Sequence, residues 1–214
     1  MKNIKLKNTF LILLVSGASI WAYYLFLKSS YFVIFDAWVQ ENTLAFVIYL
    51  FSYKVISILW PPLTGGLATL AAIPFLGWLG AYLVDFVGSI TGGIIAYFLG
   101  RKYSYKILRF LFDEGVIEKI KKIKVKKGKE IEAVFVYRLF FGSTILEVIY
   151  YGAGLLKIGF KNFLIGAAVS HMVVGIPSYY FAKNIIEGKN IILIIVSLAL
   201  GIPFFIKFKK RHFE

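Results

Sequence analysis

The apolar residues of this chain fall into long runs that are separated by short polar or basic segments. Residues 9–27 form the first run, which has about the length that an α-helix needs to cross a bilayer. A secretory signal peptide is the alternative, because lysines precede the run and residues 16–18 resemble a cleavage site. The run stays apolar well past that site, which favours a retained helix.

The second apolar run, residues 43–60, stops abruptly at two prolines and is followed by two glycines and a short stretch, 67–76. Prolines remove backbone donors and glycines allow non-helical dihedral angles, so a continuous span is not expected. Broken backbone at membrane depth needs protein or a water-filled cavity around it. We predict a broken hairpin over 43–76, with its tip set by Pro61, Pro62, Gly65 and Gly66.

The later runs predict three ordinary spans. Residues 78–99 carry one acid, Asp85, and a small-xxx-small pattern from Gly88 to Gly92 that suits close helix packing. Residues 160–182 form the next span, with a proline near its end, and residues 190–208 form the last.

Residues 131–156 are apolar but interrupted. Arg138 and Glu147 are costly in lipid, and a glycine at 142 lies between them. We therefore predict a second broken hairpin here, with Gly142 as a backbone device at its tip.

Two segments predict helices at the membrane surface. Residues 31–41 mix aromatic and charged side chains, and the basic segment 101–129 has regularly spaced apolar residues.

Topology connects these elements. With the N-terminus inside, and with hairpins that enter from opposite sides, every strongly basic segment lies on the cytoplasmic side. Treating both broken runs as full spans leaves only residues 67–76 to return across the membrane. The predicted fold class is therefore all-α integral membrane: four spanning helices plus two opposed re-entrant hairpins in an inverted repeat, with interfacial amphipathic helices.

Composition supports a membrane protein and excludes several other classes. The chain of 214 residues is 59% hydrophobic and 17% charged. Its formal net charge is +14, but eleven Lys/Arg lie between residues 101 and 129 and others at the two ends, which is the positive-inside pattern rather than a nucleic-acid-binding domain. The sequence has no cysteine and two histidines, and it lacks nucleophile, paired-Asp and HExxH motifs. We expect no metal, no cofactor and no enzymatic activity.

Several motifs resemble the DedA/VTT (SNARE-associated) superfamily over about residues 43–190. The first set is the Pro-Gly tip at 60–66, the glycine-spaced helix that follows it, and the closing Gly100-Arg101. The second set is Tyr137-Arg138 with Gly142, Gly152-Ala-Gly154 and Gly175-Ile-Pro177.

This resemblance implies two opposed re-entrant hairpins and a role in moving lipids across the bilayer. Bacterial members are implicated in undecaprenyl phosphate recycling and in envelope or proton-motive-force homeostasis, and eukaryotic relatives in phospholipid scrambling. The chain departs from many bacterial members in two places. Gly65 and Gly66 stand where those members carry an acid, and Thr144 stands where they carry a second Arg.

Five side chains are candidates for headgroup binding or transport: Arg138, Asp85, Glu147, Lys54 and Thr144. Arg138 can bind a phosphate bidentately, or it can serve a structural role. Asp85 can pair with Arg138, take up protons or form a structural salt bridge, and Glu147 can act as a relay acid or as the partner of Arg138. For Lys54, a snorkelling side chain is the favoured alternative. A packing or hydrogen-bonded role is favoured for His171.

The leading functional hypothesis is a lipid translocase or scramblase that moves a phospholipid or polyprenyl phosphate headgroup between leaflets. The alternative is a proton-coupled transporter of a small solute or ion.

Expected partners are anionic membrane lipids and, for the alternative, protons. A homo-oligomer is compatible with the sequence, and nucleic acid is not expected. We expect a prokaryotic plasma-membrane protein with both termini in the cytoplasm. Its predicted parts are an N-terminal transmembrane helix at 1–30, a core at 31–190, and a C-terminal transmembrane helix with a basic tail at 190–214.

Overall fold

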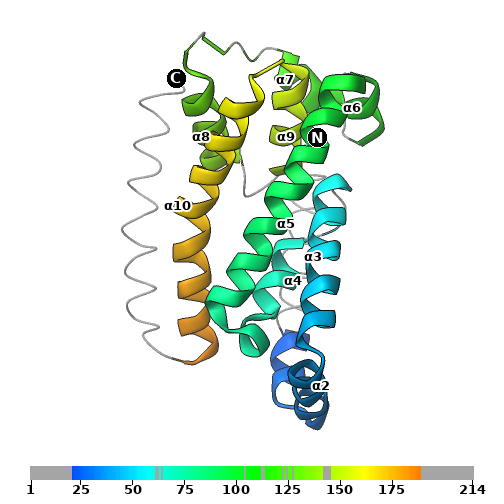
Figure 1. Ribbon diagram of the computed structural model, residues 1–214, viewed down its shortest axis with the longest axis vertical. Coiled ribbons are helices and arrows are strands. Elements are labelled where there is room, and N and C mark those ends of the chain that lie inside the picture. The colour runs from blue at the N-terminus through cyan, green and yellow to red at the C-terminus, as the bar shows by residue number, and fades with distance from the viewer. Residues whose placement is uncertain are drawn as a thin grey trace, which may run out of the picture. The chain divides into compact units, whose positions relative to one another are not determined.

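The computed structural model describes residues 21–60, 63, 65–103, 105–111, 114–121, 123, 125–126, 128–141 and 146–188. These residues form α-helices joined by short connections and contain no strand (Figure 1). Two of the helices, α5 (Ile73–Tyr103) and α10 (Phe160–Ile186), are long and apolar enough to cross a membrane. A third span is present if α2 (Ser30–Glu41) and α3 (Thr43–Leu59) are counted together. The chain is thus an all-helical integral membrane protein. The predicted span 190–208 and most of the span 9–27 lie outside the described residues.

The chain divides between Val47 and Ile48 into two compact units. In the first unit, the predicted amphipathic segment is confirmed as a helix, α2. Phe35 contacts the rings of Phe26 and Phe46, and Val39 is fully buried. These contacts give the short N-terminal unit its own small apolar cluster.

The second unit begins with the rest of α3, which ends at Leu59. The next helix, α4 (Gly65–Ala71), starts six residues later, so the predicted break at the prolines is confirmed. Gly65 lies so close to α3 that an added Cβ would be 2.7 Å from the Cβ of Ser57 and 3.1 Å from the Cδ of Lys54. The chain therefore doubles back on α3, and a side chain at position 65 would prevent it from doing so.

Helix α5 is the central element of this unit. It contains a kink at Gly77, whose φ of 68° lies in the left-handed region that glycine adopts without strain. The regular helix therefore starts where the sequence predicts the span to start, at residue 78. Gly88 and Gly92 face α3, and each would bring an added Cβ to 2.8 Å of a side-chain atom there. The predicted close packing of this glycine face is confirmed.

The basic segment forms two short helices, α6 (Tyr105–Leu111) and α7 (Glu114–Lys121). The helical prediction is confirmed, but several of its apolar residues do not face lipid. Leu108, Ile117 and Ile120 are buried in the same core as Tyr97 and Tyr150. An amphipathic pattern predicts that one face of a helix is buried, but it does not say whether lipid or protein covers that face.

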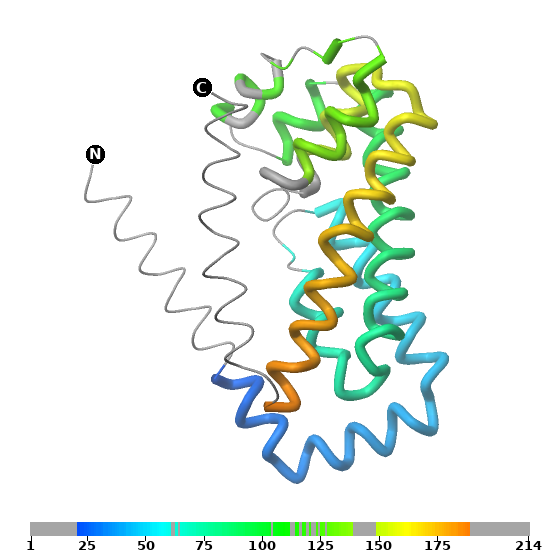
Figure 2. Tube along the Cα trace, turned by 90° about the vertical axis from the view of Figure 1, so that its left-hand side faces the viewer, coloured from blue at the N-terminus to red at the C-terminus, as the bar shows by residue number. Residues whose placement is uncertain are grey.

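The second interrupted run forms α8 (Glu130–Phe141) and α9 (Leu146–Leu155), while residues 142–145 between them lie outside the described residues. Helix α9 packs on α5, and α10 packs on both α5 and α8 (Figures 1 and 2). The ring of Tyr97 stacks on that of Phe163 at 4.8 Å, and Tyr150 meets Phe163 edge-on at 5.8 Å. This aromatic cluster joins α5, α9 and α10.

Helix α10 continues past Pro177 to Ile186, a few residues beyond the predicted end of this span. Proline is tolerated within a membrane helix where neighbouring side chains satisfy the freed backbone groups. The Ser178 hydroxyl donates to the Val174 carbonyl at 2.7 Å, one residue after the Val173 carbonyl that loses its helical N–H partner at Pro177.

Gly154 and Gly152 lie on the same helix and provide a matched test of the α5–α9 packing. An added Cβ at 154 would lie 2.8 Å from the backbone nitrogen of Arg101 and still closer to the Tyr97 carbonyl. We expect Gly154→Ala to lower the free energy of unfolding by about 1–3 kcal/mol, because the two backbones must separate. Thermal unfolding in detergent measures the change.

The control is Gly152→Ala, whose Cβ would meet only Ile120 Cγ2, at an ordinary 3.8 Å. It should leave stability unchanged or slightly higher, because alanine is the better helix former. Equal destabilisation by both variants would contradict the proposed close approach of α5 and α9.

Candidate functional site

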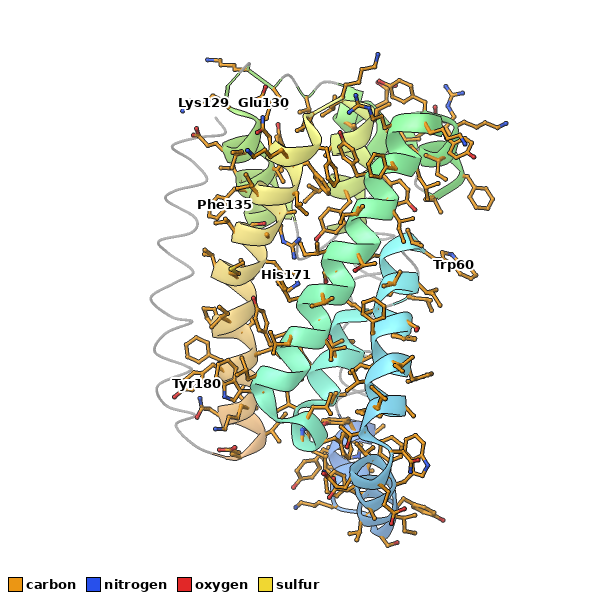
Figure 3. All side chains as sticks on the ribbon, viewed as in Figure 1. Trp60, Lys129, Glu130, Phe135, His171 and Tyr180 are labelled. Atoms are coloured by element: carbon orange, nitrogen blue, oxygen red, sulfur yellow. The ribbon has the colours of Figure 1, made fainter. Side chains whose placement is uncertain are left out.

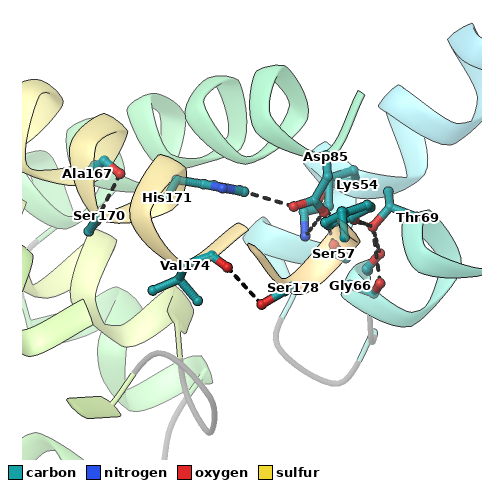
Figure 4. Close-up of polar contacts among 12 residues, drawn as sticks. Lys54, Ser57, Gly66, Thr69, Asp85, Ala167, Ser170, His171, Val174 and Ser178 are labelled. Carbon is teal, nitrogen blue, oxygen red and sulfur yellow. Dashed lines mark hydrogen bonds and ion pairs between the residues drawn. The ribbon is translucent and has the colours of Figure 1, made fainter. Parts of the chain in front are cut away.

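Asp85 lies at the centre of a buried polar cluster between four helices (Figure 4). Its Oδ1 is 2.6 Å from the Lys54 ammonium on α3, and the Thr69 hydroxyl on α4 contacts the same oxygen at 2.8 Å. Its Oδ2 is 3.0 Å from His171 Nε2 on α10. One carboxylate thus connects α5 to three other elements of the fold.

A second hydrogen bond extends the cluster along α10. The Tyr179 hydroxyl donates to Thr69 Oγ1 at 2.6 Å, and Thr69 also lies 3.1 Å from the carbonyls of Gly65 and Gly66. Thr69 therefore contacts the first residues of α4, Tyr179 of α10 and Asp85 of α5. We define these residues as the Asp85 cluster: Lys54, Thr69, Asp85, His171 and Tyr179.

Glycines on both sides provide room for the lysine. An added Cβ at Gly88 of α5 would lie 2.8 Å from Lys54 Cγ, and one at Gly65 of α4 would lie 3.1 Å from its Cδ. The aliphatic part of the Lys54 side chain therefore passes between Gly88 of α5 and Gly65 of α4 before its ammonium reaches Asp85.

Burial makes this ion pair energetically important. Both side chains are only 7% exposed, and they come from apolar helices, α3 and α5, that are candidates to cross a membrane, α3 together with α2. An isolated charge in such an environment is costly, and removal of one partner leaves the other uncompensated. The favoured interpretation of Lys54 as a snorkelling side chain is therefore wrong: Asp85 holds its ammonium inside the protein.

The imidazole of His171 lies between α10 and α5 (Figure 3). Its ring meets Tyr82 and Phe86 edge-on, with centroid distances of 5.9 and 5.4 Å. Aromatic rings thus cover the histidine, while its Nε2 faces Asp85. The sequence assigned His171 a packing or hydrogen-bonding role, and its contacts with these rings and with Asp85 fit that role.

Arg138 occupies a different place in the second unit. It lies on α8, is 7% exposed, and its Nη1 donates to the hydroxyl of Tyr150 on α9. The guanidinium carbon is also 5.5 Å from the centre of the Tyr150 ring, a cation–π distance. The Tyr150 ring packs against Gly93 and Phe163, so the residue that holds Arg138 is itself fixed.

The structure brings two of the five predicted side chains, Lys54 and Asp85, into direct contact. The pairing of Asp85 with Arg138 that the sequence allowed is not observed, because Lys54 and His171 occupy the carboxylate. Within the part of the chain that the structure describes, Arg138 has no carboxylate within ion-pair distance. The remaining predicted residues lie outside the described residues or side chains: Glu147, Thr144, Gly142, Pro61 and Pro62.

Sequence reasoning missed Thr69, Tyr179 and Tyr150, and it left His171 outside the site. His171 gave a usable signal, because it is an ionisable residue inside an apolar span. The hydroxyl residues gave none, because Thr and Tyr are common in membrane helices and at their ends. No group of three or more metal-ligating side chains occurs among the described residues.

Comparison with known proteins identifies one domain. The family model of the VTT domain matches residues 59–183, which is more than half of the chain. No curated protein and no solved structure matches the chain. The matched segment includes Asp85, Arg138 and His171, while Lys54 precedes it.

A double-mutant cycle tests the buried ion pair. We expect Lys54→Met alone to lower the free energy of unfolding by about 3–5 kcal/mol, because it leaves the Asp85 carboxylate without its ammonium. Adding Asp85→Asn should restore more than half of that loss. Unfolding in mixed micelles measures both changes.

The control is the pair Lys129–Glu132, which has the same 2.6 Å separation but side chains that are more than 60% exposed. Its hydrogen bond raises the pKa of Lys129, yet solvent screens the charges. Lys129→Gln should therefore leave stability unchanged. A loss from Lys54→Met no larger than that of the control would show that the buried pair is not structurally important.

Proposed function

The chain belongs to the VTT domain family, and on that premise we propose that it moves lipids with anionic phosphate headgroups between the two leaflets of a membrane. The cargo is a phospholipid or a polyprenyl phosphate, and the role is membrane or envelope homeostasis. We place the protein in a prokaryotic plasma membrane with both termini in the cytoplasm, because the basic segments then lie inside.

One observation carries this proposal: the described interior holds more positive than negative charge. Among the described side chains, the buried basic and acidic residues are Lys54, Arg138, Asp85 and His171. With a neutral histidine, these side chains carry two positive charges and one negative charge. Uncompensated charge is costly within a membrane, so an anionic ligand in this region would be stabilised.

The lengths of the helices support re-entrant hairpins. Helix α4 has seven residues and α9 has ten, which correspond to about 10 and 15 Å, whereas a bilayer core is about 30 Å thick. Neither arm can cross the membrane by itself. We therefore propose that α3–α4 and α8–α9 enter from opposite faces, as an inverted repeat requires.

The chemistry of Arg138 suits a phosphate. Its planar guanidinium can donate two parallel hydrogen bonds to phosphate oxygens, which a point charge such as lysine cannot do. Tyr150 holds the guanidinium without neutralising it, because a phenol hydroxyl accepts the hydrogen bond and carries no charge. The acyl chains of the cargo would remain in the lipid while the headgroup passes this residue.

The contact between His171 and Asp85 favours a second candidate, a proton-coupled transporter of a small solute or ion. This function predicts solute flux in liposomes that collapses on Asp85→Asn or Glu147→Gln without any movement of lipid. Lipid movement without solute flux excludes it.

Replacement of Arg138 tests the lipid proposal. We expect Arg138→Gln to slow the leaflet exchange of phosphatidylglycerol in liposomes by about tenfold or more, since hydrogen bonds to charged groups contribute about 1.5–3 kcal/mol. Arg138→Lys should give an intermediate rate, because it keeps the charge and loses the bidentate geometry. Fluorescent phosphatidylglycerol in reconstituted liposomes provides the measurement.

Arg109→Gln is the matched control, because Arg109 is 63% exposed and lies 4.0 Å from Glu114 on the basic segment. It should exchange lipid at the wild-type rate. Equal rates for folded Arg138→Gln and wild type would refute the role of Arg138, and the absence of exchange in wild type would refute the function.

A further inference from the structure

The second ring nitrogen of His171 is buried and has no hydrogen-bond partner within the described part of the chain. His171 as a whole is 4% exposed. Because its Nε2 faces a carboxylate oxygen, which can only accept, the contact assigns the hydrogen to Nε2. A lone pair therefore remains on Nδ1, the one basic position in the imidazole that is still open.

A second buried polar atom, on a ring that contacts the His171 imidazole, is also unsatisfied. The hydroxyl of Tyr82 is buried and has no partner among the described residues, and its ring meets that of His171 edge-on. Buried polar atoms without partners are rare in folded proteins, and each one calls for an explanation such as an unseen water or a proton-binding role. Of the three unsatisfied buried side-chain atoms among the described residues, two belong to rings that contact each other, those of His171 and Tyr82, and the third is Ser89 Oγ.

The charges around His171 can be counted element by element. Lys54 of α3 and Asp85 of α5 carry opposite charges and cancel, and Arg138 of α8 is the other buried cation among the described side chains. The other polar groups of the cluster are hydroxyls: Thr69 of α4 contacts Asp85, Tyr179 of α10 contacts Thr69, and the ring of Tyr82 on α5 contacts His171. Tyrosine stays neutral in the range where histidine titrates.

A proton on Nδ1 changes this balance. The imidazolium then competes with Lys54 for the single carboxylate of Asp85, so the cluster holds two cations and one anion. The imidazole is fixed by the aromatic rings around it, whereas the ammonium of Lys54 can turn about the last bonds of its side chain, beyond the Cγ and Cδ atoms that lie against Gly88 and Gly65. Lys54 is therefore the cation that can leave.

We propose that His171 Nδ1 is a proton-binding site, and that a proton there releases Lys54 from Asp85 to bind the phosphate of an anionic headgroup. This inference rests on the proposed lipid-moving function and assigns its regulation. The proton comes from water, forms an N–H bond at Nδ1, and returns to water when the headgroup leaves. No other covalent bond changes.

Linkage makes the proposal measurable. If the protonated form binds the anion more tightly, the anion must raise the proton affinity of His171 by the same factor. Phosphatidylglycerol is a suitable probe, because its phosphodiester keeps one negative charge across the titration range of histidine. Phosphatidylcholine with the same acyl chains is the neutral counterpart.

The experiment uses the wild-type protein labelled with ¹⁵N-histidine, in which only His171 and His212 give signals. We expect short-chain phosphatidylglycerol to raise the midpoint of the His171 titration by roughly one pH unit, the shift for tenfold tighter binding. Phosphatidylcholine should leave the midpoint unchanged. An identical midpoint with both lipids, or a His171 that does not titrate between about pH 5 and 8, would overturn the proposal.

Variants then identify the released cation. In Lys54→Gln, His171 should still titrate, but phosphatidylglycerol should no longer shift its midpoint. In His171→Gln, which keeps an N–H donor for Asp85, phosphatidylglycerol binding should lose its pH dependence. His212→Gln serves as the control and should behave as wild type. A full lipid-induced shift in Lys54→Gln would overturn the role of Lys54, and the wild-type titration decides the linkage if a variant does not fold.

Leaflet exchange measured on the same preparations separates this inference from the function on which it rests. Exchange without a lipid-dependent shift of His171 refutes the proton-operated release and leaves the lipid-moving function standing. A lipid-dependent shift without exchange at any pH refutes the lipid-moving function and supports a binding site alone.

Discussion

The fold of the second unit depends on one buried carboxylate. Asp85 contacts Lys54 of α3, Thr69 of α4 and His171 of α10, so four helices meet at its two oxygens. An ionised carboxylate inside an apolar region is stable only when it is paired and hydrogen-bonded. This requirement fixes the positions of α3, α4 and α10 relative to α5.

Small residues make these contacts possible. The glycines of α5 let α3 and α9 approach its backbone, and Gly65 lets α4 fold back onto α3. The same close packing positions Tyr150, which holds Arg138 of α8. The buried cations lie on α3 and α8, each of which is followed by a shorter helix, and we propose that an anionic ligand there replaces their lost hydration.

Hydropathy and backbone chemistry predict much of this architecture. The helix break after residue 59 follows from the prolines and glycines, and the start of the central span follows from Gly77. The pairings could not be predicted, because Thr69 and Tyr179 are 110 residues apart and periodicity does not say which faces meet. Hydropathy also cannot distinguish a face covered by lipid from one covered by protein, which explains the buried side of α6 and α7.

We propose that the surplus of positive charge among the described buried side chains selects anionic headgroups. The most direct measurement compares the leaflet exchange of phosphatidylglycerol and of phosphatidylcholine with identical acyl chains, in liposomes that contain the wild-type protein. Protein-dependent exchange should be at least severalfold faster for phosphatidylglycerol. Equal rates for the two lipids, or no exchange above protein-free liposomes, would contradict the account.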